Sequence, residues 1–147
     1  MLLGIAMVWM LTGNHQIAAY RDSMRTGDNP PLLFQLDQVN SDVRFIVVDN
    51  FGINATATYL GILTIGNWFH VAGVRQGNTL NVYVNGIEGA LVSRTLGPIS
   101  VDNLKIGALL THGAPVTHFF NGFIDDVRIY NRALSAEEVL QLYQDGL

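Results

Sequence analysis

The sequence contains no cysteine, which excludes a disulfide framework and any zinc site built on thiolates. Charge is scarce as well, because only 14% of the 147 residues are Asp, Glu, Lys or Arg, and the formal net charge is −4. The eight Lys and Arg residues are scattered, so the chain lacks the basic surface with which proteins neutralise phosphates. The composition therefore argues against a nucleic acid as a partner.

An apolar stretch of the length that crosses a bilayer, about 20 residues, is also missing. The N-terminal run MLLGIAMVWML is shorter and carries no positive charge ahead of it, so it is interpreted as a buried strand rather than a signal peptide. Hydrophobic residues nevertheless make up 49% of the chain. This excess fits a sandwich whose strands are covered on both faces, and it fits equally a chain that buries part of its surface in an assembly.

The sequence does contain many short apolar segments separated by Gly, Asn and Pro, which is the pattern of strands and turns. In the clearest hairpin, residues 68–86, both faces carry apolar side chains, as expected for strands inside a sandwich. The fold class is therefore predicted to be all-β, an antiparallel β-sandwich, and its length suits a single domain over residues 1–147. The predicted strands are Ile5–Leu11, Gln16–Arg21, Leu32–Leu36, Val43–Asp49, Ala55–Leu60, Trp68–Arg75, Leu80–Asn85, Ala90–Arg94, Asn103–Leu109 and Gly122–Tyr130.

One short helix is predicted at the C-terminus, over residues 135–145. Ser135 and Glu138 have the S-x-x-E spacing of a capping box, in which each side chain accepts a backbone N–H at the helix start. Four apolar residues then form a stripe, and Gly146 is a natural stop. We expect this helix to pack on the sandwich rather than bind a ligand. The stripe consists of Val139, Leu140, Leu142 and Tyr143.

Two motifs carry a family resemblance. The first is Trp68-x-His70-Val71 followed by Tyr83-Val84-Asn85-Gly86, and the second is GFIDDVRIY at 122–130 with the helix behind it. In these segments the chain closely resembles laminin G-like, concanavalin A-like lectin jelly rolls. The resemblance implies a jelly-roll sandwich, a non-catalytic module that binds carbohydrate or a protein surface, and an extracellular or cell-surface location.

The residues give no support for an enzyme. No Ser stands at the spacing of a nucleophile elbow, and His70 is interpreted as a core histidine. Glycosidases of related jelly rolls use two paired carboxylates. The chain has only three glutamates, and two of them belong to the predicted helix. We therefore predict that the protein is not an enzyme.

Ligand-binding residues are predicted in two polar loops, residues 21–31 and 110–118. Arg and Tyr suit sugar hydroxyls and ring faces, so the first candidates are Tyr20, Asp22, Arg25 and His112. Asp125 is expected to be buried, because strand alternation places it with Val127 and Ile129. It would then either cap loop N–H groups or, as the family resemblance suggests, hold calcium.

The resemblance also raises an assembly hypothesis. Members of the family usually carry one or two strands before the tryptophan strand, and this sequence starts almost on it. An open sheet edge is commonly paired by a partner chain. The alternative function is therefore a self-assembling structural subunit, a homo-oligomer with Met1–Leu11 at the contact. A further possibility is a fragment of a larger secreted protein whose enzyme lies elsewhere.

Overall fold

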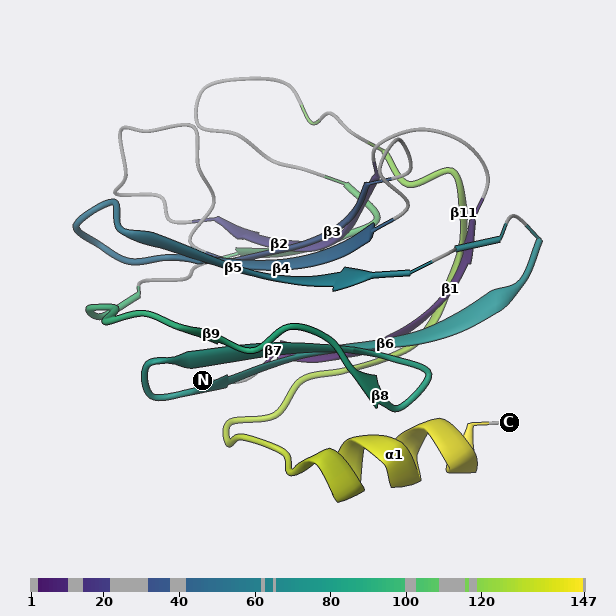
Figure 1. Cartoon of the computed structure of the whole chain (residues 1–147). Coiled ribbons are helices and arrows are strands. Elements are labelled where there is room, and N and C mark those ends of the chain that lie inside the picture. Colours follow the sequence, from purple (N-terminus) through teal and green to yellow (C-terminus); the bar gives the residue numbers. More distant parts are fainter. Residues whose placement is uncertain are drawn as a thin grey trace.

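The structure, a computed structural model, describes residues 3–10, 15–21, 32–37, 42–61, 63–64, 66–99, 103–108, 116 and 119–146, with only the backbone over 3–10, 15–21, 37 and 103–104. Its strands form two antiparallel sheets that face one another, and a helix, α1 (Ala136–Asp145), lies beneath one of them (Figure 1). The predicted fold class is therefore confirmed. Within the described residues, no helix has the length and hydrophobicity needed to span a bilayer.

Sheet A, which carries α1, has the strand order β11-β1-β6-β7-β8, and β9 also pairs with β7. Sheet B has the order β10-β2-β3-β4-β5. The strands of sheet A are β1 (Leu3–Met10), β6 (Trp68–Gln76), β7 (Thr79–Val84), β8 (Ile87–Glu88), β9 (Val92–Ser93) and β11 (Gly122–Arg128). Those of sheet B are β2 (His15–Arg21), β3 (Leu32–Asp37), β4 (Asp42–Val48), β5 (Asn54–Leu60) and β10 (Asn103–Ile106).

The core lies between the two sheets, because strand alternation sends every second side chain there. The rings of Phe34 and Phe45 meet edge to face, with centroids 5.8 Å apart and planes at 89°. Gly73 of β6 sits opposite Phe45, and a Cβ built at Gly73 would lie 2.6 Å from a carbon of that ring. A glycine is therefore required there. Fully buried core side chains include Leu32, Val43, Phe45, Val47, Val71, Leu80 and Val82.

A second cluster holds α1 against the outer face of sheet A. Ala72 and Val74 point away from the main core and meet Val139, which is fully buried. Tyr83 and Leu134 complete the buried part of this cluster. The helix is thus a packing element, as predicted, and it explains why the strands of the hairpin carry apolar groups on both faces.

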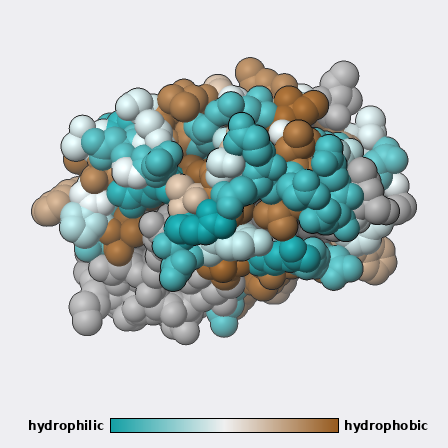
Figure 2. Space-filling view, turned by 90° about the horizontal axis from the view of Figure 1, so that it is seen from below, coloured by the Kyte–Doolittle hydropathy of each residue, from teal (hydrophilic) through white to brown (hydrophobic). Residues whose placement is uncertain are grey.

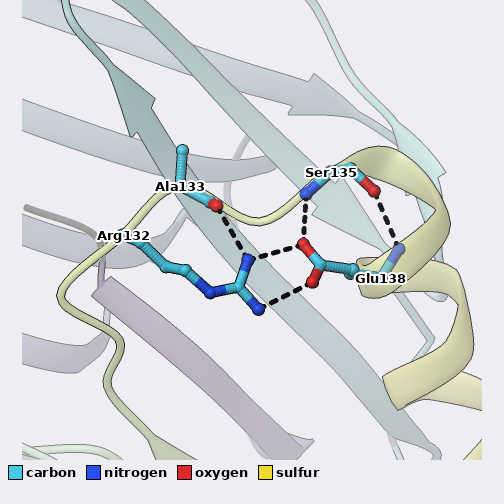
Figure 3. A network of polar contacts seen from close by, with 4 residues as sticks. All are labelled: Arg132, Ala133, Ser135 and Glu138. Carbon is cyan, nitrogen blue, oxygen red and sulfur yellow. Dashed lines mark hydrogen bonds and ion pairs between the residues drawn. The ribbon is translucent and has the colours of Figure 1, made fainter.

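The start of α1 is fixed by a local polar network (Figure 3). The Ser135 hydroxyl accepts the Glu138 N–H at 3.2 Å, and the Glu138 carboxylate accepts the Ser135 N–H at 2.8 Å, which completes the predicted capping box. Arg132 donates from both terminal nitrogens to the same carboxylate, at 2.8 and 2.6 Å. This guanidinium and the cap lower the pKa of Glu138 to about 2.

Two predictions about the strands were wrong. The segment Ala90–Arg94 contains only the two-residue β9, and the sequence reasoning missed β8 at the end of the 68–86 hairpin. More importantly, β1 is not at an edge, because it pairs with β6 on one side and β11 on the other. The edge next to it is β11. The expected subunit contact at Met1–Leu11 therefore does not follow from an open edge at that strand.

Candidate functional site

The predicted ligand-binding residues fall mostly outside the described residues. Asp22, Arg25 and His112 lie there entirely. Tyr20 lies within β2, where its backbone pairs with Leu32 of β3 and Leu104 of β10. Their role in binding remains a prediction.

The strands that precede the two predicted loops, β2 and β10, form an antiparallel ladder. In this antiparallel pair Arg21, the last residue of β2, is opposite Asn103, the first residue of β10. Ile106, the last residue of β10, is opposite Ala18. The last residues of β2 and β10 therefore lie at opposite ends of this ladder.

Asp125 is exposed, so the expectation that it is buried was wrong. The reason is a β-bulge: Asp126 has a positive φ of 50°, and the register between β1 and β11 shifts there. The extra residue lets Ile124 and Val127 both pack against the core. Asp125 and Asp126 are left outside, although a regular strand would have placed Asp125 with Val127.

Both carboxylates at the bulge already have partners. Asp125 accepts the N–H of Asp126 at 2.8 Å, and Asp126 forms an ion pair with Arg128, also at 2.8 Å. Calcium takes six to eight oxygen ligands. The described part of the chain contains no group of three or more acidic or histidine side chains that could hold a metal. The described acidic side chains at the bulge do not by themselves complete a calcium site, and calcium at Asp125 remains a prediction.

The buried carboxylate that organises a loop is instead Asp49, at the turn after β4. Its side chain is fully buried and accepts the N–H groups of Phe51 and Ile53 at 2.9 Å and of Gly97 at 2.8 Å. These bonds fix the turn between β4 and β5 and fasten the segment after β9 to it. Capping loop N–H groups, a role considered for Asp125, is thus performed by Asp49 in the turn between β4 and β5.

His70 is a core histidine, as interpreted, and lies between β6 and α1. It is 2% exposed, and its ring faces that of Tyr143, with centroids 5.9 Å apart. Neither ring nitrogen has a hydrogen-bond partner within the described part of the chain. Burial lowers the pKa of His70 to about 4, against a smaller opposing effect of Asp126. The neutral ring suits packing rather than acid–base chemistry at neutral pH.

The outer face of sheet B carries a row of polar side chains. Gln35 of β3, Arg44 of β4 and Thr58 of β5 are directly opposite one another in the register, and all three are half-buried. Arg44 is oriented by Asp42, which accepts its terminal N–H at 2.9 Å. The row offers amide, guanidinium and hydroxyl groups on rigid strands, a set that can bind hydroxyl-rich ligands.

The sequence reasoning missed this row, although a signal for it exists. Gln35, Arg44 and Thr58 each alternate with buried apolar residues, as in the segments LFQLD, DVRFIVV and NATATYL. Alternation alone predicts one polar face per strand. Only the register of three neighbouring strands shows that the polar positions form one row.

Comparison with solved structures shows the same fold at low sequence identity. A native heptameric SAP-like pentraxin from Limulus polyphemus matches with a TM-score of 0.75 and 17% identity, over 97% of this chain and 69% of the pentraxin chain. The CBM40 of Ruminococcus gnavus IT-sialidase, bound to α2,3-sialyllactose, matches with a TM-score of 0.76 and 17% identity, over 97% of this chain and 83% of the CBM40 chain. At this identity the likeness concerns the fold.

Sequence comparison gives a curated relative and a family. Human Pappalysin-1 is 29% identical over 89 residues, which is 60% of this chain but only 5% of that protein. The present chain thus corresponds to a small part of that relative. The family model of the concanavalin A-like lectin/glucanases superfamily matches residues 8–140. The chain therefore belongs to the concanavalin A-like lectin/glucanase superfamily.

Proposed function

We propose that this chain is a non-catalytic, extracellular recognition module that binds carbohydrate on the outer face of sheet B. The observation that supports it most is the row of Gln35, Arg44 and Thr58, set on the strands of a fold shared with lectins. Strands hold such groups more precisely than loops do. The carbohydrate-bound CBM40 shows that this fold accommodates an oligosaccharide in at least one neighbour.

The placement of the glutamates supports a role without catalysis. Glycoside hydrolysis needs two carboxylates facing one another across the scissile bond. Glu137 and Glu138 lie in the first turn of α1, where Glu138 is held by Arg132 and the cap. Glu88 lies on β8 and accepts the side-chain amide of Asn81. The superfamily includes glucanases, so the proposal of a non-catalytic role depends on the residues and not on the fold.

The proposal is tested by a glycan array on the whole chain, with calcium and again with a chelator. The expected result is binding to at least one glycan, weakened in Gln35→Ala/Thr58→Ala and in Arg44→Lys. Lysine keeps a positive charge beside Asp42 but loses the forked donor geometry. Thr95→Ala, an exposed threonine between β9 and β10, is the control and should bind as the wild type does. The absence of binding to any glycan at high micromolar concentration would refute the proposal.

The alternative, a self-assembling structural subunit, is favoured by one observation. Within the described residues β11 pairs with β1 only, so one side of this seven-residue strand has no strand beside it. Size-exclusion chromatography with light scattering separates the two functions. A defined oligomer that binds no glycan would support the subunit, and a monodisperse monomer would exclude it.

A further inference from the structure

An aromatic row crosses three neighbouring strands at one end of sheet A. In the register Trp9 of β1 is opposite Phe123 of β11 on one side and Trp68 of β6 on the other. The preceding row, in which Ile124 and Phe69 flank β1, packs against the core. By strand alternation Phe123 and Trp68 therefore belong to the outer face. Their exposed fractions are large, 67% and 42%.

The helix covers the neighbouring part of this face and stops short of the aromatic row. His70, the next outward residue of β6, is buried against Tyr143 near the end of α1. Trp68, two residues away, is exposed. Figure 1 shows β6, β1 and β11 curving away from α1 at the right of the view. Figure 2 shows the helix side of the molecule, where hydrophobic patches reach the surface between hydrophilic ones.

Hydrogen-bonding groups stand at both ends of the row. Asp125, two residues after Phe123 on the same face, is exposed and uses one carboxylate oxygen for the N–H of Asp126. Asn67, next to Trp68, is exposed and donates to the Thr64 hydroxyl at 2.6 Å. An exposed aromatic surface flanked by a carboxylate and an amide offers a ring to stack on and hydrogen-bonding groups at its rim. These match the apolar C–H face and the peripheral hydroxyl groups of a pyranose ring.

We propose that this aromatic row is a second carbohydrate subsite, which takes the apolar C–H face of a neutral pyranose. Strand spacing puts Phe123 and Trp68 about 10 Å apart, two inter-strand distances, with Trp9 between them in the register. That span suits two adjacent sugar rings of an extended oligosaccharide. The assignment rests on the proposed function and adds a location on the opposite sheet.

Charge favours a neutral sugar over an acidic one. The bulge beside the row carries Asp125 and Asp126, and the cation at the end of the same strand, Arg128, is already paired with Asp126 at 2.8 Å. A carboxylate on the sugar would therefore be repelled by Asp125 and Asp126, because Arg128 at the bulge is already paired with Asp126. This subsite should then discriminate against sialic acid, the sugar of the oligosaccharide seen on the CBM40 neighbour.

Intrinsic fluorescence offers a direct test, because both tryptophans of the chain, Trp9 and Trp68, lie in this row. The whole chain is titrated with cellohexaose, mannohexaose, xylohexaose and 3′-sialyllactose, and calorimetry is recorded in parallel. The expected result is a saturable change of tryptophan emission with at least one neutral oligosaccharide and none with 3′-sialyllactose. Phe123→Ala should weaken that binding about 5- to 10-fold, the usual scale for one aromatic contact.

Controls separate this subsite from the proposed function. Phe51→Ala removes an even more exposed phenylalanine, at the turn after β4 in sheet B, and should leave binding unchanged. Asp125→Asn, also at an exposed position, should weaken binding and keep the fold. Binding by calorimetry with unchanged emission and full affinity in Phe123→Ala would overturn the subsite and leave the proposed function standing. Failure of all four oligosaccharides in both measurements would overturn the subsite, and an empty glycan array beside it would overturn the proposed function as well. Emission changes with 3′-sialyllactose would overturn the neutral-sugar assignment.

Discussion

The two outer faces of the sandwich differ in what covers them and in the side chains that they carry. On sheet A, Ala72, Val74 and Tyr83 are packed with α1, whereas Trp68 and Phe123 of the same face are exposed. On sheet B, the outer positions of neighbouring strands carry a polar row, with Leu33 and Ile46 as a small apolar contact beside it. A covered face contributes stability, whereas polar groups on rigid strands contribute little to stability and can serve a ligand. Substitutions on the two faces should therefore have different consequences.

The largest effect is expected beneath the helix. Val139→Asp should destabilise the protein by at least about 3 kcal/mol, because it buries a carboxylate among the apolar side chains of the α1 cluster. Leu140→Asp is the matched control, since Leu140 is the next residue of α1 and is 41% exposed. Urea unfolding measures both. Equal losses would mean that α1 does not pack through Val139.

Acid should weaken the same face through His70. Its pKa is lowered from 6.5 to about 4, because burial disfavours the charged ring, while Asp126 raises it and Arg128 lowers it further to lesser degrees. Above pH 6.5 the ring is neutral in both states and stability is complete. Between pH 6.5 and 4 only the unfolded chain binds the proton, so stability falls as the pH falls, by roughly 3 kcal/mol in total, and levels off below pH 4.

Replacing the ring without the titration isolates this effect. His70→Phe should keep the contact with Tyr143 and lose most of the pH dependence between 6.5 and 4, as followed by urea unfolding at a series of pH values. Its stability at pH 8 should change little, because no described residue hydrogen-bonds the His70 ring nitrogens. An unchanged pH profile in the variant would show that other groups cause the acid sensitivity.

A smaller effect is expected at the start of the helix. Ser135→Ala should cost about 1 kcal/mol, since it removes the side chain that accepts the Glu138 N–H at the first turn. Glu138→Gln should destabilise less, because the amide can still accept the Ser135 N–H while the ion pair with Arg132 is lost at an exposed position. Thermal unfolding of both variants compares the cap with the ion pair. A larger loss of stability in Glu138→Gln than in Ser135→Ala would mean that the ion pair contributes more than the cap.

Much of the fold could be predicted because it depends on local patterns. Alternation and turn residues located most strands, and the S-x-x-E spacing located the capping box at Ser135. Alternation gave the wrong face for Asp125. The bulge at Asp126 adds one residue to β11, so the side chains before the bulge point to the opposite face from the one that regular alternation predicts. The positive φ of Asp126 depends on pairing with β1, a strand more than a hundred residues away in the sequence. A local sequence pattern carries no information about that pairing.

The candidate site was less predictable than the fold because it depends on register. Gln35, Arg44 and Thr58 are unremarkable residues in three separate strands, and only the pairing of β3, β4 and β5 sets them in one row. The aromatic row is similar, because Trp9, Trp68 and Phe123 are distant in sequence and meet through the order β11-β1-β6. The sequence-based candidates in the loops were instead chosen by residue type, and residue type does not predict which loop residues lie close together.

The smallest effect on stability should come from the outer face of sheet B, where we propose that carbohydrate binds. Thr58→Ala removes a half-buried hydroxyl on a face that bears no helix among the described elements, so the free energy of unfolding should change by less than about 0.5 kcal/mol. If the polar row binds carbohydrate, the same variant weakens glycan binding while urea unfolding is unchanged. Thr56→Ala, at the other outward threonine of β5 and opposite Ile46 rather than in the polar row, should leave both unchanged. A stability loss above about 1 kcal/mol in Thr58→Ala would mean that this face, like that of sheet A, is covered for stability.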